Sequence, residues 1–297
     1  MVETRHIRAD NNGVQIEAIE WAPATALGVP IVFIPGGTGH ALSGENIGPE
    51  SAEGRIGDLP RRFLSISRRG TGRSGAPPTG YAPSDFAADV HAAATAADLG
   101  RFVLFGHSMG VPIALEYGLR HPDAVSGLVL GDTPAAYIDF KRAATFDALL
   151  ARPFEFASEE EAFEKEASAF SDRDEARRVF DRIKHRMFVP RGDKIVRLID
   201  RAALARTVEE SVDAAKEYWG DLHRLKCPVL VVRGTGGAWT PLSEEHVARY
   251  RRLVPSVTID DVPGGHQLGL HGDRGPLRDA IARFMLPLDQ LRSRSRD

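Results

Sequence analysis

Three uninterrupted apolar runs, each bounded by glycine or proline, constrain the fold of this chain more than any other feature. They cover residues 31–34, 102–105 and 228–232. Runs this short without polar alternation favour strands buried on both faces, as in the centre of a parallel sheet. Weaker strand patterns cover residues 14–21, 63–67, 127–130 and 257–262, and helical patterns cover 84–98, 109–121, 241–253 and 274–285. Because strands and helices alternate, the sequence predicts an α/β fold with a mostly parallel sheet.

Residues 135–222 interrupt this alternation. Helical spacing recurs there and we find no strand pattern, so we predict a helical insertion between two strands. Its first half is acidic and its second half basic, which we interpret as solvated helix faces. The charged residues are Glu159, Glu160, Glu161 and Glu164, then Arg177, Arg178, Arg182, Lys184 and Arg186. After the insertion, Thr240 and Pro241 predict a helix start, with a hydroxyl N-cap and proline at the first helical position.

The composition excludes several classes of protein and site. The chain has 297 residues, 42% hydrophobic and 27% charged, which is typical of a globular protein. Its net charge of −3 gives no basic surface for nucleic acid. Cys227 is the only cysteine, so neither a disulfide nor a cysteine-based metal site can form within one chain. We find no apolar run that could span a bilayer and no signal-peptide core, so we expect a cytoplasmic protein.

Residues 106–110, Gly-His-Ser-Met-Gly, carry the strongest catalytic signal. A G-x-S-x-G sequence between a strand and a helix is typical of a nucleophile elbow, which exposes the serine Oγ above the sheet. The flanking glycines avoid clashes in the sharp turn, and the following helix directs its positive end toward Ser108. We therefore expect Ser108 to be the nucleophile. The alternative is an ordinary loop serine between glycines.

A catalytic serine also needs a base and an oxyanion hole. His266 is the expected base, because it follows the last predicted strand, and Gly264 and Gly265 can turn its loop back toward Ser108. His271 is the fallback, and His107 is expected to point away into packing. The backbone N–H groups of Met109 and of Gly37, in the glycine-rich loop 35–39, are the expected oxyanion donors. The alternative for this loop is a plain glycine-rich turn without a catalytic role, which would have the same sequence pattern.

Together these residues resemble the α/β-hydrolase superfamily, in its small branch of esterases, lactonases and C–C bond hydrolases. The resemblance covers nearly the whole chain and rests on PGGTG at 35–39, RRGTGRSGAP at 68–77, GHSMG at 106–110 and GGH at 264–266. It implies an eight-stranded, mostly parallel sheet with helices on both faces. It also implies a core of residues 1–134 and 223–297 and a helical cap of residues 135–222 over the active site.

The segment 70–75 formally matches the dinucleotide-binding pattern G-x-G-x-x-G. A dinucleotide site needs a helix to begin there, so that its N-terminus faces the pyrophosphate. Pro77 and Pro78 follow and bias the chain away from helix. The same segment is usual in the hydrolase family, so we expect no nucleotide cofactor.

The third member of the triad departs from the family pattern. Most relatives place an aspartate a few residues after strand seven, but Gly237 occupies that position and residues 235–242 contain no carboxylate. Some relatives take the acid from the end of strand six, where this chain has Asp132. We predict that Asp132 orients His266. The alternative is a turn-capping aspartate before Thr133 and Pro134.

These observations predict a cofactor-independent serine hydrolase that cleaves an ester or lactone bond of a small organic substrate. The expected triad is Ser108, His266 and Asp132, acting through an acyl-enzyme, with Gly37 and Met109 as oxyanion donors and no metal ligand. The alternatives are a C–C bond hydrolase or lyase with the same triad, or a catalytically weak ligand-binding protein. We expect a monomer or a homodimer whose partner is the small-molecule substrate, with no membrane or nucleic-acid partner.

Overall fold

An eight-stranded sheet forms the centre of the protein. The computed structural model describes the chain except for residues 137–146, 168–171, 214–216, 237–240, 271–273 and 295–297. The strand order is β1-β2-β4-β3-β5-β6-β10-β11, and pairing is parallel from β4 to β11 and antiparallel for β1 with β2 and β2 with β4. The strands are β1 (Val2–Asn11), β2 (Val14–Pro23), β3 (Ile31–Ile34), β4 (Phe63–Ile66), β5 (Phe102–His107), β6 (Val125–Gly131), β10 (Val229–Thr235) and β11 (Val257–Pro263). The predicted α/β fold is confirmed.

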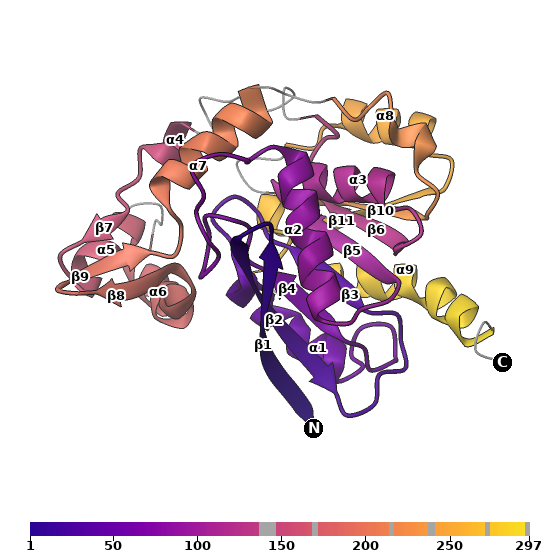
Figure 1. The fold of residues 1–297 in the computed structure, drawn as a ribbon, viewed down its shortest axis with the longest axis horizontal. Helices are drawn as coiled ribbons and strands as arrows, with labels where there is room; N and C mark the ends of the chain where they lie inside the picture. Colours follow the sequence, from indigo (N-terminus) through magenta and orange to yellow (C-terminus); the bar gives the residue numbers. More distant parts are fainter. Residues whose placement is uncertain (137–146, 168–171, 214–216, 237–240, 271–273, 295–297) are drawn as a thin grey trace.

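Helices cover both faces of this sheet (Figure 1). One apolar layer joins the sheet to α2 (Pro83–Ala96), α3 (Gly110–Arg120) and α8 (Glu244–Leu253). The other joins it to α1 (Gly48–Ala52) and α9 (Gly275–Arg294). The central strands β3, β4 and β5 are buried along their whole length, as the uninterrupted apolar runs of β3 and β5 predict. Within the described residues, every helix is too short or too polar to cross a membrane.

The predicted strands and core helices are all present, with three differences. Strand β1 was not predicted, and its polar sequence suits its position at the sheet edge. Asn12 and Gly13, both with positive φ, form its turn to β2, and Asn-Gly is a strong hairpin signal. The helix expected from residue 241 begins at Glu244, with Ser243 as its N-cap. The predicted cap Thr240 lies outside the described residues.

The insertion between β6 and β10 contains a small sheet as well as helices, so the all-helical expectation is wrong for this segment. Its helices are α4 (Ala148–Leu150), α5 (Glu159–Ala167), α6 (Arg173–Met187) and α7 (Arg201–Thr207). Its sheet has the order β7-β9-β8, from β7 (Glu155–Phe156), β8 (Phe188–Arg191) and β9 (Lys194–Arg197). A two-residue turn at Gly192 and Asp193 joins β8 to β9, and glycine supplies the positive φ that such hairpins need.

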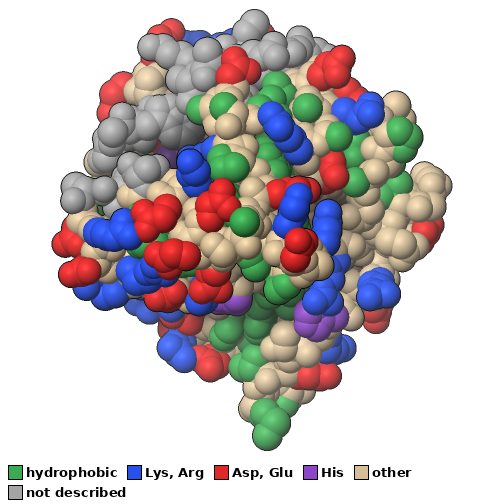
Figure 2. Space-filling model, turned by 90° about the vertical axis from the view of Figure 1, so that its left-hand side faces the viewer, with side chains coloured by type: hydrophobic (Ala, Val, Ile, Leu, Met, Phe, Trp, Pro, Cys, Tyr) green, Lys and Arg blue, Asp and Glu red, His purple; other side chains and the backbone are tan. Residues whose placement is uncertain are grey.

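Charged side chains of both signs are interspersed on the outer face of this insertion (Figure 2). The acidic residues of α5 pair with basic residues of α6: Glu160 with Arg177 at 2.6 Å, Glu164 with Arg173, and Glu159 with Lys184. Exposed ion pairs of this kind each contribute little stability. The interpretation of solvated helix faces holds for these pairs but not for Arg186, which is buried.

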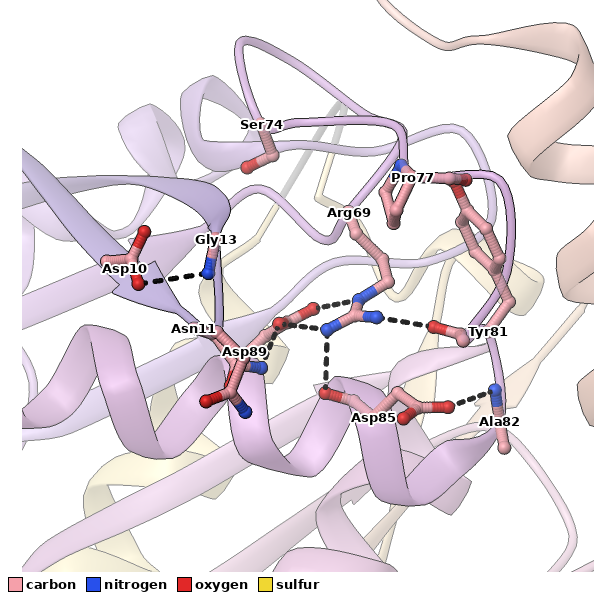
Figure 3. A network of polar contacts seen from close by, with 12 residues as sticks. Asp10, Asn11, Gly13, Arg69, Ser74, Pro77, Tyr81, Ala82, Asp85 and Asp89 are labelled. Atoms are coloured by element: carbon pink, nitrogen blue, oxygen red, sulfur yellow. Dashed lines mark hydrogen bonds and ion pairs between the residues drawn. The ribbon is translucent and has the colours of Figure 1, made fainter.

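The glycine-rich segment 70–75 is a tight loop supported by neighbouring polar groups. Its backbone closes on itself from Gly70 N to Gly75 O, at 2.9 Å. Just before it, the buried Arg69 donates to both carboxylate oxygens of Asp89 on α2 and to the carbonyl of Gly80 (Figure 3). Among the described residues, the helix that follows begins only at Pro83, so no helix N-terminus faces the glycines. The segment thus connects β4 to α2.

A buried ion pair attaches α9 to the sheet. The Arg61 side chain is fully buried, and its Nη2 lies 2.9 Å from Asp289 Oδ2 on α9. Arg61 also donates to the carbonyls of Ile56 and Val29, and the Val29 N–H donates to Asp289. Each charge is therefore desolvated and compensated by the other, and removal of either partner leaves an unpaired charge in the interior.

We expect Asp289→Ala to lower the free energy of unfolding by about 3–5 kcal/mol, because Arg61 remains buried without its counter-charge. Urea denaturation followed by circular dichroism measures this loss. Asp279→Ala is the matched control, since Asp279 is an exposed aspartate on the same helix and should change stability by less than about 0.5 kcal/mol. Equal effects of the two substitutions would contradict the assignment.

Candidate active site

Ser108 occupies a strained turn between β5 and α3. Its φ of +53° lies in the left-handed region, which non-glycine residues rarely adopt. The turn is tight: a Cβ at Gly106 would lie 2.2 Å from the carbonyl oxygen of Gly110. The Ser108 N–H donates to the carbonyl of Gly131 on β6, at 3.0 Å. The predicted elbow geometry is therefore present, with the serine held just before the N-terminus of α3.

The Ser108 hydroxyl is hydrogen-bonded to His266, with 2.9 Å between Oγ and Nε2. His266 lies in a short 3-10 turn, Gly265–Gln267, directly after β11. His107 contacts this turn, because its Nε2 lies 2.8 Å from the carbonyl oxygen of His266. His107 is thus buried, as predicted, but it also contacts the histidine loop. The fallback His271 lies outside the described residues.

Asp132 is the carboxylate that reaches His266. Its Oδ2 lies 2.9 Å from His266 Nδ1, and its Oδ1 accepts the Gly234 N–H at 3.0 Å. The Asp132 side chain is fully buried. Its φ of +49° is one that aspartate tolerates better than most residues, and this turn directs the carboxylate across the end of β6 toward β10. The Asp132 side chain therefore connects the end of β10 with the turn that carries His266.

The glycine-rich loop after β3 lies against the nucleophile. A Cβ at Gly36 would lie 2.9 Å from Ser108 Cβ, and one at Gly37 would lie 3.1 Å from Met109 Sδ. Arg68 Nη2 donates to the carbonyls of Gly36, at 3.1 Å, and Gly37, at 2.6 Å. Because C=O and N–H point in opposite directions across a trans peptide, the Gly37 N–H is directed away from Arg68. The sequence analysis missed Arg68, although it begins the family-like segment at 68–77.

A cavity of about 220 Å³ opens at these groups. Its walls include Ser108, His266, Gly37 and, from helix α6 of the insertion, Ile183, Arg186 and Met187. Among the described residues of the insertion, Phe156 and Phe188 pack together and are absent from the wall of this cavity. The wall opposite the nucleophile therefore comes from α6.

Metal and cofactor ligands are not grouped in the part of the chain that the structure describes. A set of three or more His, Cys, Asp or Glu side chains in metal-binding arrangement is absent there. The lone Cys227 is buried, and burial raises the pKa of its thiol to about 11. It is therefore a poor nucleophile and a poor metal ligand at neutral pH.

Comparison with known proteins identifies the family. Residues 29–271 match the family model described as alpha/beta hydrolase fold. The chain belongs to this family. A 2-(acetamidomethylene)succinate hydrolase of Mesorhizobium japonicum is 29% identical over 214 residues, which cover 69% of this chain and 72% of that protein. A putative carbamate hydrolase of Klebsiella pneumoniae is 34% identical over 110 residues, 37% of this chain and only 40% of the relative's length.

A solved structure with this fold aligns with nearly the whole chain, including the insertion. The crystal structure of an E-2-(acetamidomethylene)succinate hydrolase superposes with a TM-score of 0.71 and covers 99% of this chain and 98% of that one. The two sequences are 22% identical in this comparison, so the likeness concerns the fold alone. This chain is thus a hydrolase-fold protein in which the insertion has a counterpart.

We expect Asp132→Asn to lower kcat toward an aryl ester by about 10⁴-fold with little change in KM, because asparagine no longer favours the productive histidine tautomer. Stopped-flow or steady-state release of 4-nitrophenol measures it. Asp261→Asn is the control, since Asp261 is an exposed carboxylate on β11 that pairs with Arg233. Wild-type turnover by Asp132→Asn would assign the orienting role to another residue.

Proposed function

We propose that this chain is a serine hydrolase that cleaves an ester or lactone bond of a small organic substrate. One observation carries the proposal: the hydrogen bonds Ser108 Oγ to His266 Nε2 and His266 Nδ1 to Asp132 Oδ2, each 2.9 Å, at the wall of a cavity. A hydroxyl, a base and an orienting carboxylate in this order can activate a serine without a cofactor. Membership of the α/β-hydrolase family supports the same chemistry.

The reaction begins when Ser108 Oγ attacks the carbonyl carbon and His266 Nε2 takes its proton. Asp132 stabilises the resulting imidazolium. The N–H groups of Gly37 and Met109 are the proposed donors to the oxyanion. When the tetrahedral intermediate collapses, His266 gives its proton to the leaving alcohol, or to the tethered alcohol of a lactone. Water then attacks the acyl-enzyme, with His266 again as base, and releases the acid and free Ser108.

The leaving group of the substrate decides which carbonyl compounds come first. Two relatives are named for the hydrolysis of 2-(acetamidomethylene)succinate and of a carbamate, so we include a substrate with a nitrogen leaving group as the second candidate. An ester is the less demanding substrate, because an alcohol is a better leaving group than an amine. We therefore put esters and lactones first and an amide-like substrate second.

A fluorophosphonate probe tests the nucleophile directly. We expect covalent labelling of Ser108, detected by intact-mass spectrometry and peptide mapping, and loss of the label in Ser108→Ala. Ester turnover by Ser108→Ala should fall by about 10⁶-fold, as expected when a triad nucleophile is removed. Thr133→Val, beside the triad acid, keeps the nucleophile and should still be labelled. Absence of Ser108-dependent labelling would favour a binding protein on the hydrolase scaffold.

A further inference from the structure

Arg186 is a buried cation at the wall of the catalytic cavity. It belongs to the last turn of α6, is only 7% exposed, and lines the same cavity as Ser108 and His266. The other basic residues of this helix pair with acidic residues at the surface or extend into solvent. Burial of an arginine is costly, so a buried guanidinium normally has its donors fully satisfied.

The guanidinium of Arg186 lacks these partners among the described residues. Its Nε and Nη1 are buried without a hydrogen bond. Its one ion pair is with Glu45, whose Oε1 lies 3.1 Å from Nε but outside hydrogen-bond direction. Both carboxylate oxygens of Glu45 also contact His185 Nε2, at 2.9 and 3.1 Å. Burial lowers the pKa of Arg186; the charge of Glu45 raises it in part, and the charges of Arg182 and Arg274 lower it again. An anion in the cavity would satisfy both the charge and the donors.

The backbone of Arg186 is fixed by the core of the protein. The buried His40, which follows the loop carrying Gly37, contacts the Arg186 carbonyl oxygen through Nε2. Burial lowers the pKa of His40, so the ring is neutral and donates this hydrogen bond. This contact joins the end of α6 to the core beside the glycine-rich loop 35–39. The position of Arg186 relative to Ser108 is therefore set by the fold.

We propose that Arg186 binds a carboxylate of the substrate, so that the hydrolysed compound is a small carboxylate-bearing ester or lactone. A planar guanidinium matches a carboxylate, which can accept two parallel hydrogen bonds from it. The cavity of about 220 Å³ is smaller than the roughly 300–1,000 Å³ that hold drug-sized ligands. The scissile carbonyl and the carboxylate must therefore lie close together in one short molecule. This inference rests on the proposed hydrolase function for its catalytic step but not for binding.

The test uses the monoethyl esters of malonate, succinate and glutarate, each paired with the neutral ester in which an amide replaces the free carboxylate. Proton NMR follows ethanol release. We expect wild-type kcat/KM to favour the best monoester over its amide twin by about 100-fold. Arg186→Gln should abolish this preference, because kcat/KM falls far more for the monoesters than for their neutral amide twins. Arg186→Lys should retain part of the preference, because it keeps the charge without the planar donor pair.

Arg178→Gln is the matched control, since Arg178 is an exposed arginine on the same helix and its loss removes the same charge. It should leave both classes of ester unchanged. Equal losses on charged and neutral esters in Arg186→Gln would indicate a structural role and overturn the inference. So would a wild-type enzyme without preference for the monoesters.

A binding measurement separates this inference from the proposed function. Monoethyl succinate is titrated into Ser108→Ala and into Ser108→Ala/Arg186→Gln by calorimetry, with the amide twin as control. We expect Kd to rise by about 100-fold when Arg186 is replaced. Arg186-dependent binding without any ester turnover by the wild type would contradict only the hydrolase proposal. Ester turnover with Arg186-independent binding would contradict only the carboxylate site.

Discussion

The carboxylate of Asp132 is the contact on which the geometry of the site depends. One of its oxygens accepts the Gly234 N–H at the end of β10, and the other contacts His266 in the turn after β11. Chain segments at the carboxyl ends of three neighbouring strands, β6, β10 and β11, thereby converge on one buried carboxylate. Such a charge is stable in the interior only when its hydrogen bonds are complete. The carboxylate that contacts the histidine therefore also connects the carboxyl ends of β6 and β10.

A residue of this site can be predicted from the sequence where its chemistry depends on neighbouring residues in the chain. It cannot be predicted where its role depends on a contact with a residue far away in the sequence. Ser108 is recognisable because strand, glycines and helix are contiguous, and the strain at its φ is local. Asp132 could be named only as a candidate, because its contact with His266 spans 134 residues along the chain. Arg68 was missed for the same reason: its hydrogen bonds to the loop at Gly36 arise only when β3 and β4 pair.

The errors in secondary structure have a similar physical origin. Strand β1 is polar because it is an edge strand, and apolar periodicity cannot detect a strand that buries little. The hairpin of β8 and β9 was obscured by charged residues at Arg191 and Lys194, although Gly192 between them marks the turn. Arg186 was grouped with the exposed basic residues of α6, since charge patterning does not reveal which side of a helix faces the core.

Two parts of the chain form the site: loops of the core and helix α6 of the insertion. The proposed catalytic groups come from loops of the core, and hydrogen bonds connect them directly or through backbone. The opposite wall comes from α6, whose outer face carries only solvent-screened ion pairs and tolerates charge changes at little energetic cost. Arg186, by contrast, is buried, so the low local dielectric strengthens any interaction that its charge makes. Substrate preference can therefore change through one residue of α6 while the geometry at Ser108 stays fixed.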